Sequence, residues 1–179
     1  MKVAITGHTS GIGKSLAQVY EKHGHDVMGF SRANGYDITK PEDRSRIIQH
    51  SQDCDLFINN AYSGFAQADL LFDLYTAWFG QKKRIVNISS SQTTRWETTY
   101  HNIRYRTHKV ALEAACEFLW NKNPWPEVTL VSPTMTETPM TEYRVSPNKV
   151  DPDVFAETVY QCLDKKEFRV QVFKIAVNP

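Results

Sequence analysis

The sequence predicts one doubly wound α/β domain, in which helices cover both faces of a mostly parallel sheet. Two observations predict this fold class: short β-rich runs alternate with longer helical segments, and a glycine-rich turn joins the first run to the first helical segment. A chain of 179 residues has room for one such domain with a full core and not for a second. We therefore expect residues 1–179 to form a single three-layer α/β/α domain.

The elements follow one another in regular order. The first strand contains the apolar run Val3-Ala4-Ile5, the third ends in Asn59-Asn60, and the fourth ends in serines. Strands are expected at 2–6, 26–31, 54–60, 83–89, 127–132 and 168–177, and helices at 13–24, 41–50, 68–80, 106–120 and 151–163.

Two long irregular stretches, 91–102 and 134–149, each follow an expected strand. Ligands of open α/β sheets bind beyond the carboxyl ends of the strands, near the point where the strand order reverses. We expect both stretches to border the functional site.

Charge and cysteine content limit the class of partner. Lys and Arg number 21 against 20 for Asp and Glu, so the chain has no general attraction to nucleic acid or to an anionic membrane. Cys54, Cys116 and Cys162 are widely spaced in apolar segments, as is typical of free thiols in a reducing compartment. With no apolar signal core, no membrane span and no metal-ligand spacing among the histidines, we expect a cytoplasmic protein that binds small molecules and no metal.

The stretch TGHTSGIGKS, residues 6–15, has two interpretations. A P-loop requires a glycine five residues before Gly13, and that position holds His8. The same stretch fits Thr-Gly-x-x-x-Gly-x-Gly between a strand and a helix, in which Gly7 permits the turn, Gly11 lets pyrophosphate approach, and Gly13 allows close packing. The pattern favours a dinucleotide site with phosphates at the helix N-terminus.

Further motifs follow the glycine turn: Asn59-Asn60-Ala61, the run IVNISS at 85–90, Tyr105-x-x-x-Lys109, and the segment from Pro133 to Pro139. In kind and order these motifs resemble the short-chain dehydrogenase/reductase family, over Lys2 to about Met140. The resemblance implies a Rossmann-type nucleotide-binding fold and a nicotinamide cofactor. A second Tyr-x-x-x-Lys match, Tyr36 and Lys40, precedes a turn and Pro41, so we interpret it as a partly buried tyrosine and a solvated lysine.

By this resemblance, Tyr105 donates a proton to a substrate carbonyl while the nicotinamide delivers hydride. Lys109 favours the phenolate form of Tyr105 and bonds the nicotinamide ribose, and the i,i+4 spacing places both residues on one helix face. Ser90 bonds the carbonyl oxygen, with Ser91 as the alternative. The predicted catalytic residues are Ser90, Tyr105 and Lys109.

The cofactor is expected to be NADP(H), with NAD as a second possibility. A dinucleotide site selects NADP when an arginine rather than an acid follows the second strand, and this chain has Ser31-Arg32 there. The resemblance also implies that Asp37-Ile38 contacts adenine and that Asn59 ties neighbouring strands together. The expected cofactor-binding residues are Gly7, Thr9, Ser10, Gly11, Ile12, Gly13, Ser31, Arg32, Asp37, Ile38, Asn59, Asn60, Ala61, Tyr105, Lys109, Pro133, Thr134, Met135 and Thr138.

The chain departs from the family pattern in three places. Only four residues separate Arg32 from Asp37, so we expect the second helix of the family to be missing and its third strand to be a stub. No asparagine occurs between Tyr62 and Arg84, so the proton relay through a helical asparagine is absent or rebuilt, with Gln67 or Ser63 as substitutes. Tyr62 replaces a glycine, and we expect its side chain to crowd the nicotinamide side or redirect the loop.

Two functions remain open. The first is a compact NADPH-dependent reductase that converts a small carbonyl compound to an alcohol. The resemblance also implies a homodimer formed through two apolar helical segments, 68–79 and 111–120, with the alternative that both only cover the sheet. The second is a catalytically impaired NADP(H)-binding regulatory or scaffold protein. The residues considered for substrate binding, as anchors for an anionic or aromatic compound or as plain surface residues, are Arg95, Trp96, Tyr100, Arg104, Tyr143 and Arg144.

Overall fold

The structure is a computed structural model that describes residues 1–94, 100–122, 124–146, 148–164 and 170–175. Its centre is one six-stranded sheet in the order β2-β1-β3-β4-β5-β6, and every neighbouring pair is parallel. The strands are β1 (Lys2–Thr6), β2 (Asp26–Phe30), β3 (Leu56–Asn59), β4 (Arg84–Ile88), β5 (Glu127–Pro133) and β6 (Val172–Ile175). The expected doubly wound fold is confirmed, with an all-parallel sheet. The ends of the expected last strand, 168–169 and 176–177, lie outside the described residues.

Five α-helices connect the strands. They are α1 (Gly11–Lys22), α2 (Pro41–His50), α3 (Ala66–Ala77), α4 (Tyr100–Trp120) and α5 (Pro152–Leu163), with 3-10 turns η1 (Arg32–Asn34), η2 (Ser91–Thr94) and η3 (Pro139–Thr141). Helix α4 starts six residues before the expected start at 106, so the end of the expected irregular stretch 91–102 is helical.

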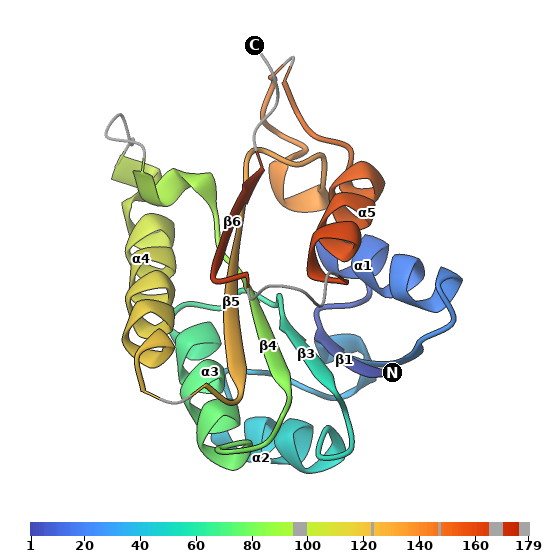
Figure 1. Ribbon diagram of the computed structural model, residues 1–179. Helices are drawn as coiled ribbons and strands as arrows, with labels where there is room; N and C mark the ends of the chain where they lie inside the picture. Colours follow the sequence, from blue (N-terminus) through green and yellow to red (C-terminus); the bar gives the residue numbers. More distant parts are fainter. Residues whose placement is uncertain (95–99, 123, 147, 165–169, 176–179) are drawn as a thin grey trace.

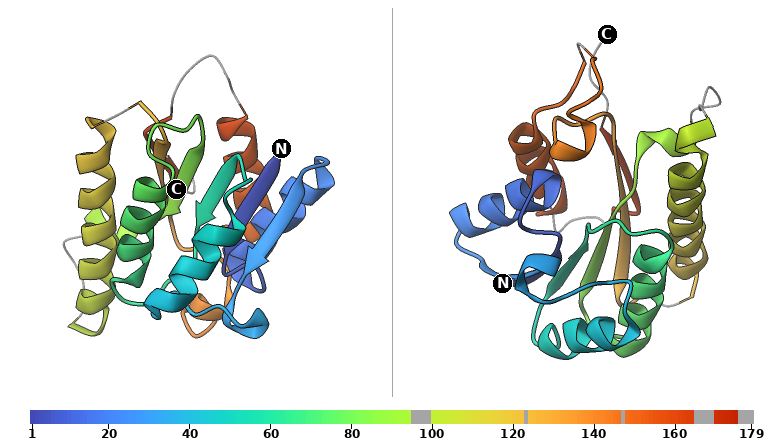
Figure 2. Two further views of the ribbon diagram at one scale, coloured as in Figure 1. Left: turned by 90° about the horizontal axis from the view of Figure 1, so that it is seen from below. Right: turned by 180° about the vertical axis from the view of Figure 1, so that it is seen from behind.

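The helices form two layers on opposite faces of the sheet (Figures 1 and 2). Neighbouring strand residues point to opposite faces: Val3 and Ile5 pack with α1 and α5, whereas Ala4 packs with α2, α3 and α4. Because both faces are covered, the central strands β1, β3, β4 and β5 are buried along nearly their whole length, whereas exposure alternates along most of the edge strands β2 and β6. Trp78 anchors the end of the short α3 against β3, with its ring 6.1 Å from that of Phe57.

The connection between β2 and α2 contains no strand, although the sequence predicts a short one there. Its residues form η1 and then turn back at Gly35, which has φ 85°. The Tyr36 N–H donates to the Ser31 carbonyl at 2.9 Å, and the Tyr36 ring packs on Phe30. Where a short strand is expected, the chain forms this turn, and β2 is the edge of the sheet.

The strand order reverses at β1, which pairs with β2 on one side and β3 on the other. The two loops that follow β1 and β3 are bonded to each other: the N–H groups of Asn60 and Ala61 both donate to Thr6 Oγ1 at 3.0 Å. This reversal point is where an open α/β sheet binds its ligand.

Candidate functional site

The glycine turn between β1 and α1 is shaped by close backbone approach. Gly7 and Gly11 have φ of 72° and 52°, a region that favours glycine. A Cβ on Gly13 would lie 2.2 Å from the Gly7 carbonyl oxygen, so this position also requires glycine. Ser10 at the N-cap makes no side-chain capping bond, which leaves the first N–H groups of α1 available to an anion.

A pocket of about 780 Å³ opens beside this turn, at the carboxyl ends of the strands. Gly13 and Asn59 do not line it: Gly13 packs against the turn, and Asn59 is buried between elements. The predicted site residues that line the pocket are Gly7, Thr9, Ser10, Gly11, Ile12, Ser31, Arg32, Asp37, Ile38, Asn60, Ala61, Ser90, Tyr105, Lys109, Pro133, Thr134, Met135 and Thr138.

Asn59 holds the strands and α3 together. Its Nδ2 donates to Asn87 Oδ1 on β4 at 3.0 Å and to the Gln67 carbonyl at 2.8 Å. These bonds match the expected strand-tying role, and they fix α3 over the carboxyl ends of β3 and β4.

Lys109 is a buried cation with neutral partners. Its Nζ donates to Gln67 Oε1 at 2.8 Å and to the Ile88 carbonyl at 2.7 Å. Gln67 in turn donates through Nε2 to the carbonyls of Asn59 and Ile88, at 2.7 and 3.0 Å. Burial lowers the pKa of Lys109 to about 7, against a smaller opposing effect of Glu113. Lys109 therefore changes its charge close to neutral pH.

Tyr105 is partly buried beside Lys109, whose Nζ lies 5.8 Å from the ring centroid. Burial raises the pKa of the Tyr105 phenol, whereas a hydrogen bond with Ser90 and the charge of Arg144 lower it. Ser90 is the buried serine of the pair, and its Oγ also accepts from the Gln92 N–H at 3.2 Å. The contact with the phenol involves Ser90, and the choice of Ser90 over Ser91 as the catalytic serine stays a prediction. The charge of Arg144 thus favours the phenolate, and the expected effect of Lys109 stays a prediction.

A model of the NAD dependent epimerase/dehydratase family matches residues 3–170. The chain belongs to this family, an extended group of short-chain dehydrogenases/reductases. The resemblance inferred from the motifs is thus confirmed. A search of curated protein sequences finds no significant match.

Solved structures of short-chain dehydrogenases/reductases share the fold. The 3-alpha-hydroxysteroid dehydrogenase from Pseudomonas sp. B-0831, complexed with NADH, has a TM-score of 0.80 at 20% identity, with 98% of this chain and 95% of that chain covered. The 3-ketoacyl-(acyl-carrier-protein) reductase from Brucella melitensis, also with NADH, has 0.82 at 17%, covering 97% and 96%. A short-chain dehydrogenase from Sphingobium yanoikuyae in complex with NADPH has 0.76 at 18%, covering 97% and 87%. Because the sequence identities are low, these similarities show a shared fold alone.

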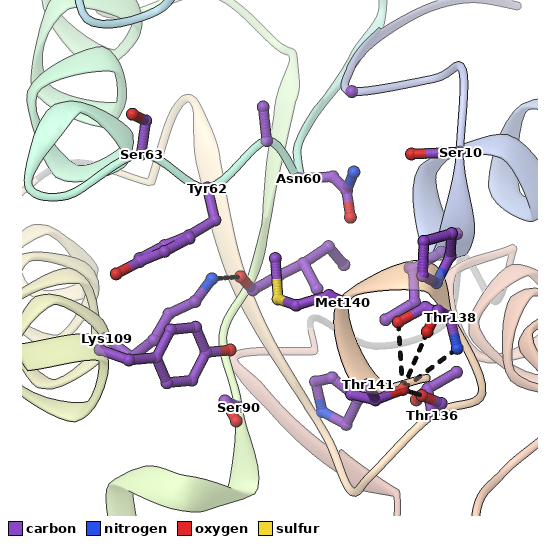
Figure 3. A pocket seen from close by; sticks show the side chains of 18 of the residues that line it. Ser10, Asn60, Tyr62, Ser63, Ser90, Lys109, Thr136, Thr138, Met140 and Thr141 are labelled. Atoms are coloured by element: carbon purple, nitrogen blue, oxygen red, sulfur yellow. Dashed lines mark hydrogen bonds between the residues drawn. The ribbon is translucent and has the colours of Figure 1, made fainter. Parts of the chain in front are cut away.

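Tyr62 forms one wall of the pocket of this family member. Its ring packs edge-on against Tyr105 with centroids 4.8 Å apart, and Lys109 Nζ lies 5.4 Å from its centroid. The hydroxyl is bonded to His108 Nδ1 at 2.9 Å, so the side chain is held at its far end. Figure 3 shows Tyr62, Lys109 and Ser90 on one side of the pocket, and Ser10 and Thr138 on the other. Tyr62 thus occupies the side of the pocket where Tyr105 and Lys109 lie, and its effect on the nicotinamide stays a prediction. Its bond to His108 has no sequence signal, because it joins two distant elements.

The irregular segment after β5 closes the opposite side. Thr138 packs on Gly11, where an added Cβ would lie 3.2 Å from the threonine. Thr141 Oγ1 accepts from the Thr138 N–H at 3.1 Å and donates to the Thr136 carbonyl (Figure 3). Sequence reasoning selected Thr138 and missed Thr136 and Thr141, which hold the threonine against the glycine turn.

The residues considered for substrate binding fall into three groups. Tyr143 and Arg144 line the pocket. Arg104 is exposed and does not line it. Arg95, Trp96 and the side chain of Tyr100 lie outside the described residues.

Within the described ranges, no three His, Cys, Asp or Glu side chains gather as a metal site would require. The helices in those ranges are also too short or too polar to cross a bilayer. Cys54, Cys116 and Cys162 are free thiols.

Proposed function

We propose that this protein is an NADP(H)-dependent oxidoreductase that reduces a small carbonyl compound to an alcohol. The observation that carries the proposal is the meeting of Ser90, Tyr105 and Lys109 with the glycine turn at one pocket. The residues fit a dinucleotide, because the glycine turn has no room for side chains at Gly13 and offers free N–H groups at the start of α1. The solved structures of similar fold that carry NADH or NADPH support a nicotinamide cofactor.

The nicotinamide would supply the hydride, and residues of the chain would supply the proton. Tyr105 gives its phenolic proton to the carbonyl oxygen, and the Ser90 hydroxyl donates to the same oxygen as charge develops there. Burial raises the pKa of the phenol and opposes the phenolate, which the Ser90 hydrogen bond and the charge of Arg144 favour. Tyr62 covers the Tyr105 ring and limits access of water from that side.

Gln67 would take the place of the missing asparagine. It lies in the first turn of α3 and bonds Lys109 directly, whereas Ser63 lines the pocket at the loop before that helix. A lysine with a pKa of about 7 can lose and regain a proton at neutral pH, so Lys109 would return a proton to Tyr105 between turnovers and recover one from water in the pocket, while Gln67 holds the lysine in place.

Arg32 supports the preference for NADP. Its side chain is exposed at the pocket and forms no hydrogen bond or ion pair with the described residues, so its donors are available to a 2′-phosphate. Asp37 lies nearby, but Oδ1 of its carboxylate already accepts from the Thr39 N–H and hydroxyl at 2.9 and 2.8 Å. Because Oδ1 already has these two partners, Asp37 is less available to accept hydrogen bonds from the ribose hydroxyls of NAD.

The alternative, a nucleotide-binding regulatory or scaffold protein, has one observation in its favour. Both hydrogen bonds of Lys109 go to protein acceptors rather than to Tyr105 or the open pocket. A protein of this kind would bind NADPH without oxidising it.

Turnover distinguishes the two. We expect purified protein with NADPH and a panel of aldehydes and ketones to oxidise NADPH, and Tyr105→Phe to lose about 10²- to 10⁴-fold in kcat. Ser90→Ala should lose more activity than Ser91→Ala, and Tyr160→Phe, on α5 and away from the pocket, serves as the control.

Undiminished NADPH oxidation by Tyr105→Phe would contradict the proposed role of the phenol. Substrate conversion without net NADPH oxidation would instead indicate a redox-neutral reaction, of the epimerase or dehydratase kind named in the family description.

A further inference from the structure

Arg144 is a partly buried cation on the wall of the pocket, held in place by neutral groups. Its Nη2 donates to Asn102 Oδ1 at 2.7 Å, and its Nε donates to the Tyr143 hydroxyl at 3.2 Å. It forms no ion pair with a carboxylate of the described residues. A guanidinium has five N–H donors, so three remain for a ligand.

Its position is at the reacting end of the pocket. Asn102 and Tyr105 both lie on α4 and line the pocket, and a spacing of three residues puts them on one face of the helix, about 4.5 Å apart along its axis. Because Arg144 is bonded to Asn102, its guanidinium lies beside the helix face that carries Tyr105. The two groups are close enough for the charge of Arg144 to lower the pKa of Tyr105.

The cofactor would not need this cation. Its phosphates would lie at the glycine turn, where Thr138 packs on Gly11, and its 2′-phosphate would lie at Arg32 after β2. Arg144 is bonded to Asn102, on the helix that carries Tyr105. Within the described part of the chain, the pocket is lined by three basic side chains and one acidic side chain. The basic ones are Arg32, Lys109 and Arg144, and the acidic one is Asp37.

We propose that the pocket selects carbonyl compounds that carry a carboxylate, and that Arg144 binds this carboxylate. The proposal rests on the proposed reductase function and names its substrate class. The fork of the guanidinium matches the two oxygens of a carboxylate, and Asn102 and Tyr143 fix its orientation before the substrate binds. In the reaction, hydride from NADPH bonds to the carbonyl carbon and the Tyr105 proton goes to its oxygen. The products are a hydroxy acid and NADP⁺, and the carboxylate is unchanged.

Matched acid and ester pairs test this selection. Phenylglyoxylate and acetoacetate are compared with their methyl esters as substrates for NADPH oxidation, by wild type, Arg144→Gln and Arg144→Lys. Arg104→Gln is the control, since Arg104 follows Asn102 closely on α4 but is exposed outside the pocket. We expect wild type to have a higher kcat/KM for the acids than for the esters. Arg144→Gln should lose about 10- to 100-fold in kcat/KM for the acids and little for the esters. Arg144→Lys should retain part of the preference for the acids.

Binding provides a readout that does not depend on turnover. With NADPH bound, phenylacetate should raise the melting temperature of wild type more than phenylacetamide does, and Arg144→Gln should lose that difference while keeping its affinity for NADPH.

Equal kcat/KM for acids and esters, or a preference that survives Arg144→Gln, overturns the proposal while the reductase function stands. Loss of NADPH affinity in Arg144→Gln assigns the arginine to the cofactor and overturns it too. Absence of NADPH oxidation with every compound contradicts the reductase function, and the melting experiment then still decides whether Arg144 binds a carboxylate.

Discussion

The carboxamide of Gln67 joins two strands to the buried lysine of the site. Its Nε2 holds the carbonyls at the ends of β3 and β4, and its Oε1 accepts from Lys109. The sequence indicates that an asparagine is missing and leaves Gln67 and Ser63 as substitutes. Only the fold separates them, because the direction of the first turn of α3 decides which side chain reaches the lysine.

Gln67→Leu should change how stability depends on pH. Burial lowers the pKa of Lys109 from 10.5 to about 7, so the unfolded chain binds more protons between these values, and the free energy of unfolding rises with pH over that range. The Gln67 oxygen stabilises the ammonium. Its loss should lower the pKa further and extend the rising range below pH 7.

Urea unfolding at pH 6 and pH 7 measures this effect in wild type, Gln67→Leu and Lys109→Met. The Lys109→Met variant lacks the lysine and corrects for the pH dependence that all other groups contribute. We expect the steepest rise in Gln67→Leu, besides a general loss of about 1–3 kcal/mol from the unpaired carbonyls. Equal slopes in Gln67→Leu and wild type would show that Gln67 supports the fold without acting on Lys109.

At the scale of elements, the order of strands and helices can be predicted from the alternation of β-rich and helical segments in the sequence. The structure of two connections cannot be predicted in this way. The start of α4 at Tyr100 follows a run of threonines and charged residues with no apolar period. The turn after β2 depends on Gly35 and on contacts of Tyr36 with Phe30, which no local pattern reveals. Tertiary packing decides both.

The outer faces of α3 and α4 carry exposed apolar side chains. Phe65, Phe72 and Phe79 recur every seven residues along α3 and its ends, and Ile103 and Val110 have the same spacing on α4, which also exposes Phe118. Seven residues are about two helical turns, so each set shares one face. The two helices lie side by side on one sheet face (Figures 1 and 2). Together they form an apolar surface of the kind that marks an interface.

We expect this surface to form a homodimer. Sedimentation velocity should give a dimer for wild type and a monomer for the double variant Phe72→Glu/Phe118→Glu, because a buried carboxylate has no partner in an apolar interface. Val154→Glu changes an equally exposed apolar residue on α5, across the sheet, and should remain a dimer. A wild-type protein that sediments only as a monomer would refute the interface.

At the scale of the whole molecule, the sheet gathers residues from distant parts of the chain at its carboxyl edge. The glycine turn, the ends of β3 and β4, α4 and the segment after β5 all reach one pocket. The motifs predict this meeting, since parallel strands place their carboxyl ends together. The hydrogen bond between Tyr62 and His108 and the anchoring of Arg144 by Asn102 could not be predicted, because each joins side chains from separate loops and helices.

Titration of the purified protein with NADPH and with NADH, followed by cofactor fluorescence at low ionic strength, decides whether the pocket is a dinucleotide site. Low salt keeps the contact of Arg32 with a 2′-phosphate unscreened. We predict tighter binding of NADPH, a preference that Arg32→Ser reduces by about 10-fold or more, and no change in Lys40→Ser, whose lysine lies in the same connection outside the pocket. Equal affinity for the two cofactors would contradict the role of Arg32, and binding of neither would contradict the oxidoreductase function itself.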